Sequence, residues 1–192
     1  MILAGTNQER LELTQKIRAG LKVEGAVGAD SFVLQSLRRK DLTTAQASYA
    51  SAYAPGDVLV PVQDYRLQGL YRAEKYTVLT VGPDTNRLTL ETPSGSVLTI
   101  DPDQCPRKTA YTTHAIRIAV GDKLRWTRNN RQVNVRNGQT IEVTEIEPDG
   151  RAKVIDAEGK TRAVNLAGKQ YLDYAWVSTT YSSQGKTANR VL

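Results

Sequence analysis

The sequence predicts a mainly β protein with flanking α structure, in which the β-rich part forms two similar small barrels. Helical spacing of apolar residues is confined to the first 54 residues of the 192-residue chain. Beyond them, short β-rich runs alternate with turn signals, a pattern typical of small barrels and sandwiches. One ordered set of motifs also occurs twice in this region. An apolar content of 40% supplies enough hydrophobic side chains for real cores.

The first predicted element is a helix over Asn7–Val23. Thr6 and Glu9 form a capping-box signal, because the Thr6 hydroxyl can accept from the backbone N–H three residues on while Glu9 reaches back. Apolar residues then recur at helical spacing, at Leu13, Ile17 and Leu21. Gly25 is the expected stop.

The elements that follow are expected to be shorter. Ser31–Leu37 is predicted as a strand and Thr43–Tyr53 as a second helix, started by Asp41 and ended by Pro55-Gly56. Further strands are predicted between turn signals, at Tyr76–Val81, Arg87–Thr92, Val97–Ile100, Thr140–Ile146 and Ala152–Ile155.

The two β regions have the character of one unit used twice. Gly56-Asp57-Val58-Leu59 opens the first region and Gly121-Asp122-Lys123-Leu124 opens the second, at an offset of 65. The pairs Pro83-Asp84 and Pro148-Asp149 keep that offset. Chance reuse of turn residues is the alternative, and ordered agreement at a constant offset favours a repeat. Two SH3-like barrels are therefore predicted near residues 55–104 and 119–172, joined by Arg107–Ile118.

The formal net charge of +6 favours a polyanionic partner. The basic residues gather in three clusters, at Arg38-Arg39-Lys40, Arg107-Lys108 and Arg125–Arg131. The third interleaves arginines with Trp126, Asn129 and Asn130, a mixture suited to phosphate contacts and base stacking.

Several kinds of site are not expected. Lys186-Thr187 fails as a phosphate-binding loop, because Thr180 stands where the first glycine is needed. One cysteine, one histidine and scattered acids give no metal-ligand cluster. Cys105 cannot form an internal disulfide, which favours a reducing cytoplasm. No apolar run approaches the ~20 residues of a membrane span, so no membrane insertion is expected.

The C-terminal residues resemble a motif of superfamily 1 helicases, T-x-H-x-S-Q-G-x-T. The matching positions are Thr179, Ser183, Gln184, Gly185 and Thr187, while Tyr181 stands where the family has histidine. In that family the motif couples nucleotide state to the grip on single-stranded DNA. The resemblance implies that the chain is a piece of a larger motor.

Two other segments carry a related resemblance. Leu3–Arg10 is similar to the segment that opens the second RecD-like motor domain. Gly121–Leu124, Asn129-Asn130 and Val135–Gly138 resemble the pattern that begins the SH3-like insertion called 2B. The order of helix, insertion barrel and S-Q-G motif resembles the conjugative relaxase-helicases of the TraI/TrwC (MobF) type. The first barrel is similar to their additional 2B-like module.

The resemblance implies a division into four regions. Residues 1–54 and 173–192 would belong to a RecA-like α/β motor domain, the latter as a return strand and the S-Q-G motif. Residues 55–118 would form the 2B-like barrel with its connector, and residues 119–172 the 2B barrel. ATP and magnesium would serve the parent protein, and no cofactor or catalysis is expected of this fragment. Tyr181 suggests the non-hydrolysing, DNA-holding helicase copy of such relaxases.

The leading hypothesis is a non-catalytic fragment that binds single-stranded DNA and carries the translocation signal for type IV secretion. The candidate DNA-contacting residues are Arg125, Trp126, Arg128, Asn130, Arg131, Arg136, Tyr181 and Ser183. Arginines would engage phosphates and Trp126 would stack on a base, with a place in the core as its alternative. Asn137-Gly138 serves either as a contact or as a tight turn.

The second hypothesis is a protein-interaction module that docks to the secretion coupling protein without DNA affinity of its own. Exposed apolar residues on the first barrel would favour it, for instance Tyr65, Leu67, Leu70 and Tyr71. In either case we expect a cytoplasmic bacterial monomer, whose parent protein is exported to the recipient cell by type IV secretion.

Overall fold

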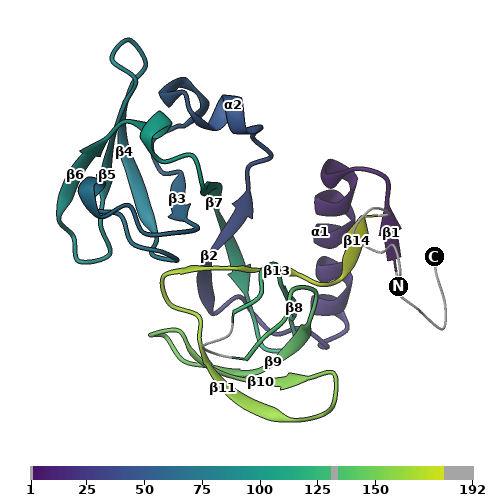
Figure 1. The fold of residues 1–192 in the computed structure, drawn as a ribbon. Coiled ribbons are helices and arrows are strands. Elements are labelled where there is room, and N and C mark those ends of the chain that lie inside the picture. The colour runs from purple at the N-terminus through teal and green to yellow at the C-terminus, as the bar shows by residue number, and fades with distance from the viewer. Residues whose placement is uncertain (1, 131–133, 180–192) are drawn as a thin grey trace. The chain divides into compact units, whose positions relative to one another are not determined.

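The computed structural model describes residues 2–130 and 134–179 (Figure 1). The chain divides into two compact units, one of Met1–Ser36 with Ala115–Leu192 and one of Leu37–His114. Strands β2 (Phe32–Arg39) and β7 (Lys108–Ile118) run from one unit into the other. The structure is mainly β, as predicted.

The two ends of the described chain meet in the first unit. Strand β1 (Ile2–Ala4) pairs in parallel with β14 (Val177–Thr179), with Ile2 opposite Val177. Helix α1 (Asn7–Val23) has the predicted bounds and lies beside β14 (Figure 1). Its capping box is confirmed: the Glu9 N–H donates to the Thr6 hydroxyl at 3.1 Å, and the Thr6 N–H donates to the Glu9 carboxylate at 3.1 Å.

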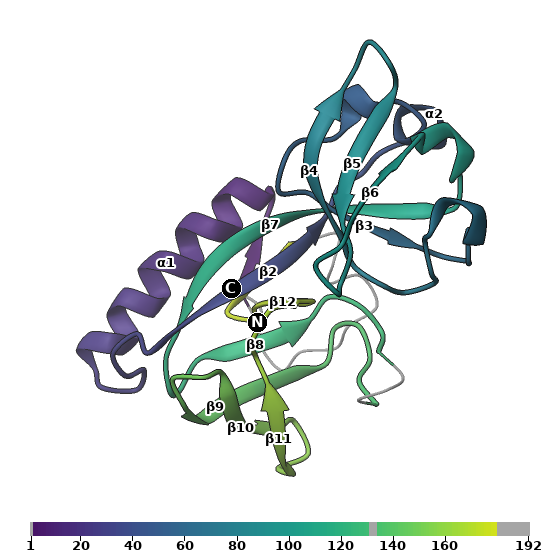
Figure 2. The ribbon, with the colours of Figure 1, turned by 90° about the vertical axis from the view of Figure 1, so that its left-hand side faces the viewer.

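A five-stranded antiparallel sheet forms the rest of the first unit, in the order β11-β10-β9-β8-β13. Figure 2 shows β9, β10 and β11 side by side. The strands are β8 (Lys123–Trp126), β9 (Thr140–Ile146), β10 (Arg151–Asp156), β11 (Thr161–Asn165) and β13 (Leu172–Tyr174). Alternation puts Leu124, Val143 and Val154 into one core cluster. The short β12 (Lys169–Gln170) pairs in parallel with β2.

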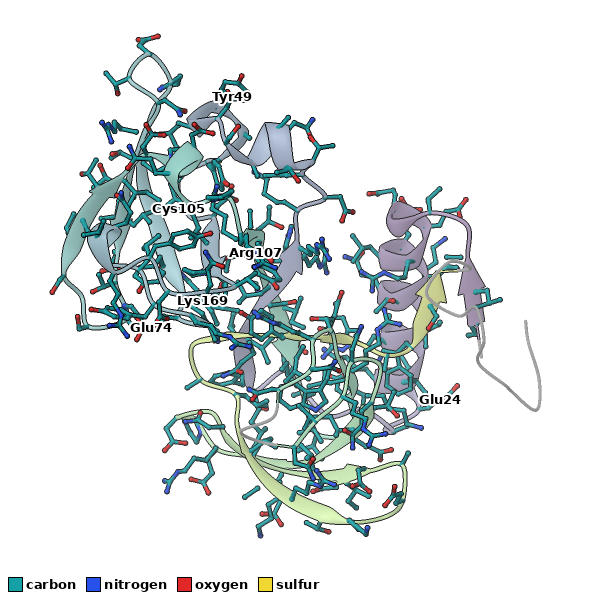
Figure 3. The ribbon with its side chains drawn as sticks, viewed as in Figure 1. Glu24, Tyr49, Glu74, Cys105, Arg107 and Lys169 are labelled. Carbon is teal, nitrogen blue, oxygen red and sulfur yellow. The ribbon has the colours of Figure 1, made fainter. Side chains whose placement is uncertain are left out.

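The strands of the second unit belong to a seven-stranded sheet, in the order β12-β2-β7-β3-β4-β5-β6. The strands that precede β7 are β3 (Val58–Pro61), β4 (Tyr76–Gly82), β5 (Arg87–Glu91) and β6 (Val97–Ile100). Short 3₁₀ turns lie at Arg66–Gln68 and Pro102–Gln104. The core of this unit includes Tyr76 and the fully buried Cys105, which Figure 3 labels.

The second helix is shorter than predicted. Only α2 (Thr44–Ala47) is α-helical, and a 3₁₀ turn at Ala50–Ala52 follows it. Its N-cap is Thr43, whose hydroxyl accepts from the Gln46 N–H at 3.2 Å, and not Asp41. Ser48 ends the helix, because its hydroxyl donates back to the Ala45 carbonyl at 2.7 Å.

The internal repeat is confirmed at its opening turn. The Asp57 carboxylate accepts from the Ala54 N–H at 2.9 Å, and the Asp122 carboxylate accepts from the Ala119 N–H at 2.8 Å. Both carboxylates are buried, at 5% and 0% exposure. Each also receives a basic side chain, Lys40 in the first repeat and Arg18 in the second. Equivalent residues therefore build equivalent turns.

The next strand repeats the correspondence. Gly56 donates to the Val78 carbonyl at 2.8 Å, and Gly121 donates to the Val143 carbonyl at 2.7 Å. Both glycines have a positive φ, of 89° and 88°, a conformation that an L side chain rarely adopts. One residue later each strand has a bulge, since the registers of β4 and β9 skip the residue after Val78 and Val143.

The repeat also includes the loop before that strand and the fifth strand of each sheet. Tyr65 and Leu70 form an isolated antiparallel bridge, as do Asn130 and Val135. β7 pairs with β3 as β13 pairs with β8. The fifth strand of the first repeat, β7, thus begins at Lys108, inside the predicted connector. Among the described residues the outer strands of neither five-stranded array pair with each other, so no closed barrel is found.

Candidate nucleic-acid interface

Strand β8 carries two of the predicted DNA-contacting residues, on opposite faces. Trp126 is 6% exposed and packs in the core cluster with Leu124. Its ring is therefore not an exposed platform for base stacking, and the core alternative describes it. Residues two apart in a strand share a face, so Trp126 points to the same side of β8 as the buried Leu124.

Arg125 lies on the other face of β8 and is half-buried. Its Nη1 donates to the Ser178 hydroxyl at 3.0 Å. Burial, together with the nearby charge of Arg10, lowers the pKa of Arg125, and Asp173 opposes that shift. Arg125 thus belongs to an internal polar cluster between β8 and β14, and not to an open phosphate-binding surface.

Buried ion pairs fix α1 to this face of the sheet. Arg10 Nη2 lies 2.9 Å from Asp173 Oδ2, and each side chain is 5% exposed. Two turns further along α1, Arg18 reaches Asp122 with two bonds of 2.7 Å. The Arg18 guanidinium also lies 4.9 Å from the centre of the Tyr174 ring. These contacts stabilise one orientation of α1 on the repeat.

Arg128 and Asn130 follow β8. The Arg128 Nη1 donates to the Tyr171 hydroxyl at 2.8 Å, with the guanidinium 5.0 Å from the ring centre. Asn130 exchanges two backbone hydrogen bonds of 2.9 Å with Val135. Both side chains are half-buried, so they can present polar atoms at the surface from fixed positions.

Arg136 is the predicted contact that the structure exposes most clearly. It opens the turn at Asn137-Gly138, where Gly138 has φ of 84° and the Gln139 N–H donates to the Arg136 carbonyl at 3.1 Å. The Asn137 N–H donates to the Asn129 side chain at 2.7 Å. The tight-turn alternative thus describes Asn137-Gly138.

The other two basic clusters are mostly internal. Lys40 Nζ donates to Asp57 at 2.7 Å and to the Ala52 carbonyl at 2.8 Å. Lys108 Nζ donates to the carbonyls of Pro102 and Cys105 at 2.6 and 2.8 Å, and burial lowers the pKa of Lys108 to about 8. Their exposed members are Arg39 and Arg107, the latter labelled in Figure 3.

Several predicted residues lie at or beyond the limit of the described chain. Thr179 is the last residue of β14. Outside the described residues lie Arg131, Tyr181, Ser183, Gln184, Gly185 and Thr187. Their roles stay predictions.

A cavity of about 280 Å³ opens in the second repeat, between the loop after β8 and strand β11. The core residues Trp126 and Ile141 line it, and so do polar side chains that the sequence alone did not single out: Gln139, Arg162, Asn165 and Gln170. Of the predicted DNA-contacting residues that the structure describes, Trp126 and Asn130 line it. A comparison of equivalent positions in the two repeats is the sequence signal that could have pointed to this cavity.

Within residues 2–130 and 134–179, no group of three or more histidine, cysteine or carboxylate side chains is placed to hold a metal ion. No helix of this part of the chain has the length and apolar character to cross a membrane.

Comparison with known proteins gives one curated similarity. No family model matches the chain. It is 21% identical over 193 residues to the multifunctional conjugation protein TraI of Escherichia coli, an alignment that covers 96% of this chain and 10% of that protein. The chain thus spans about a tenth of the length of the curated relative that it matches.

Solved structures with some likeness include Pif1 helicases. A structure of two coordinating Pif1 helicases at forked double-stranded DNA shares 23% identity at a TM-score of 0.35, over 40% of this chain and 21% of that one. Bacteroides sp Pif1 with ADP-AlF4 shares 12% identity at a TM-score of 0.22, over 100% of this chain and 33% of that one. TM-scores this low establish no shared fold.

Proposed function

We propose that this chain is an internal piece of a conjugative relaxase-helicase that binds single-stranded DNA. The observation that carries the proposal is the similarity to TraI, a conjugation protein, along 96% of the chain. The parent protein would use ATP and magnesium in its motor domains, and the piece itself would hold DNA without hydrolysing nucleotide.

The pairing of the chain's two ends supports a place inside a motor domain. β1 and β14 form a parallel sheet of two strands, with α1 beside it. Parallel sheets occur almost only as multi-stranded sheets with both faces covered. A two-stranded parallel pair therefore fits a fragment of a larger α/β sheet of the RecA-like kind. Everything between α1 and β14 then forms an insertion, and the S-Q-G motif starts at Thr179.

The repeats fit the SH3-like modules that such an insertion would contain. Each is a five-stranded antiparallel array in which the fifth strand pairs with the first. In the first repeat a 3₁₀ turn, Pro102–Gln104, precedes the fifth strand. We assign the first repeat as the 2B-like module and the second as 2B.

Single-stranded DNA would bind along the loop side of the second repeat. Arg136 is exposed there and offers a phosphate contact, while Arg128 and Asn130 are held in place beside it. Ser183 and Tyr181 would contribute from the motor side, and Gln184 and Thr187 would couple the nucleotide site to the DNA.

A second candidate function is docking to the type IV secretion coupling protein, with the translocation signal in the first repeat. Exposed apolar side chains favour it: Leu67 is 100% exposed, Tyr71 49% and Val62 46%. Of the other residues predicted for this surface, Tyr65 is half-buried and Leu70 lies in the core. The parent protein would act in the bacterial cytoplasm and pass to the recipient cell.

The DNA proposal is tested by replacing Arg136 with Gln and titrating a labelled single-stranded oligonucleotide at several salt concentrations. Loss of one phosphate contact should weaken binding several-fold and reduce the slope of log K against log salt by about 0.7. Arg151→Gln is the matched control, because Arg151 is exposed on β10 and pairs with Glu147 and Asp149. Equal slopes for all three proteins would count against Arg136 as a contact.

The docking proposal is tested with Leu67→Ser, which removes a fully exposed side chain without opening the core. Binding to the cytoplasmic domain of a coupling protein, measured by calorimetry, should weaken at least tenfold, whereas single-stranded DNA binding should not change. Unaltered coupling-protein affinity would reject this surface.

A further inference from the structure

The cavity of the second repeat is the strongest unassigned feature of the described chain. It has a volume of about 280 Å³, with an apolar floor that includes Trp126, Ile141 and Val154. Its rim carries amides and one guanidinium: Asn130, Gln139, Asn165, Gln170 and Arg162. An apolar cavity with a few convergent polar groups is the usual form of a small-ligand site.

Comparison of the two repeats explains why the cavity exists. At the 65-residue offset, Asn130 corresponds to Tyr65 and Ile141 to Tyr76. The Asn130–Val135 and Tyr65–Leu70 bridges support this alignment. In the first repeat the Tyr76 ring lies in the core cluster and the half-buried Tyr65 packs against it. The second repeat has Asn130 and Ile141 in place of these two rings, and both residues line its cavity.

One lining residue of the cavity carries a donor that has no acceptor. The Trp126 Nε1 is buried and has no hydrogen-bond partner among the described residues. Buried indole N–H groups normally find a partner. The wall of the cavity therefore contains an unsatisfied polar group.

Arg162 holds a positive charge at the rim. Its Nη2 lies 3.1 Å from Asp156 Oδ2, and the side chain is 34% exposed. Asp156 is in turn fixed by the N–H groups of Glu158 and Lys160, each 3.0 Å from its Oδ1. A planar guanidinium and several amides among the lining residues match the donor and acceptor edges of a nucleobase.

We propose that the second repeat captures one unstacked nucleobase of a single DNA strand in this cavity, with Trp126 in its wall and Arg162 as the positioning donor. The inference rests on the proposed DNA-binding function and deepens it. Phosphate contacts at Arg136 would hold the strand, and the cavity would fix one base of it. An aromatic side chain of a protein partner is the competing occupant.

The test uses the single-tryptophan variant Trp176→Phe, in which all tryptophan emission comes from Trp126. We titrate it with an oligothymidylate and with an abasic strand of equal length, and we measure both anisotropy and Trp126 emission. The expected result is quenching of Trp126 by oligothymidylate only, with affinity for the abasic strand lower by about tenfold.

Two further variants probe the cavity itself. Asn130→Tyr with Ile141→Tyr restores the rings of the first repeat and should abolish both the quenching and the preference for bases. Arg162→Gln should weaken oligothymidylate binding more than abasic binding, and it carries the test if the double variant does not fold. Arg151→Gln is the control for loss of a positive charge and should affect both strands equally.

The outcomes separate this inference from the proposed function. Equal binding of both strands without quenching would overturn the base cavity and leave single-stranded DNA binding standing. Binding of neither strand would overturn both. Quenching by N-acetyltyrosinamide but not by thymidine monophosphate would assign the cavity to an aromatic side chain of a protein partner, and would overturn the nucleobase proposal.

Discussion

Three basic side chains, Arg10, Arg18 and Lys40, each neutralise a carboxylate that is almost completely buried. A buried charge without its partner is strongly destabilising, whereas an exposed pair contributes little. These cations therefore stabilise the fold and are not available to nucleic acid. The positive charge that remains for a polyanion lies on exposed residues such as Arg136.

Removing the carboxylate of Asp173 should be the most damaging of these changes. Asp173→Asn leaves the neighbouring guanidinium groups of Arg10 and Arg125 without the carboxylate that opposes their repulsion. We expect a loss of about 3–5 kcal/mol in the free energy of unfolding, measured by tryptophan fluorescence in urea. Arg10→Gln should reduce the free energy of unfolding by a smaller amount than Asp173→Asn. The control Glu145→Gln, which breaks an exposed pair with Lys153, should cost under about 0.5 kcal/mol. Equal losses for Asp173→Asn and Glu145→Gln would contradict the buried network.

Lys108 should make stability depend on pH. Burial lowers its pKa to about 8 in the folded protein, while an unfolded lysine has a pKa of about 10.4. Between these values the unfolded chain binds the proton and the folded chain does not, so the lysine's contribution to stability rises with pH. Below pH 8 the buried charge costs stability in full.

The measurement compares Lys108 with Lys108→Met, both in a Cys105→Ala background so that the thiol does not titrate. Urea unfolding is followed by circular dichroism from pH 7 to pH 10. The protein with lysine should gain about 1–2 kcal/mol relative to the methionine variant across this range, an amount discounted for partial exposure. If the stability of the two proteins changed with pH in parallel, the pKa of Lys108 would not be shifted in the folded protein.

At the scale of elements, the opening turn of each repeat combines a glycine of positive φ with a buried aspartate. The surroundings of the two glycines differ. A Cβ on Gly121 would lie 2.2 Å from the Ala26 carbonyl oxygen, whereas a Cβ on Gly56 would meet nothing within 4 Å. The turn is thus shared by both repeats, while the close approach of another segment is peculiar to the second.

This difference predicts unequal costs for one substitution. Gly56→Ala should lose about 1–2 kcal/mol, the price of a left-handed conformation at a residue with a side chain. Gly121→Ala should lose clearly more stability, because the Ala26 backbone must also move. Thermal unfolding of both variants by circular dichroism checks the order. A Gly56 variant that is as unstable as the Gly121 variant would contradict the packing of Ala26 on the turn.

The sequence predicted well those features that depend on residues close together in the chain. The capping box gave the start of α1, and the turn glycines gave the offset of the repeat. The second helix was overestimated, because its end depends on Ser48 bonding back to the backbone. The burial of Arg125 was also not predictable, since alternation shows which residues share a face but not that β14 covers it.

At the scale of the whole molecule, the chain combines a small parallel pair with a duplicated antiparallel module. The parallel pair joins residues 2–4 to residues 177–179, so the chain enters and leaves the duplicated module at adjacent points. The two copies differ at Asn130 and Ile141, which both line the cavity. The sequence shows that these residues differ from Tyr65 and Tyr76, but only the structure shows that both of them line a cavity.

The central claim, that the chain binds single-stranded DNA, is tested most directly by fluorescence anisotropy with labelled single-stranded and duplex oligonucleotides at 50 and 200 mM salt. We predict preferential binding of the single strand, with an affinity that falls steeply between the two salt concentrations. Failure to bind either oligonucleotide at 50 mM salt would contradict the account and leave docking to a protein partner as the function of the duplicated module.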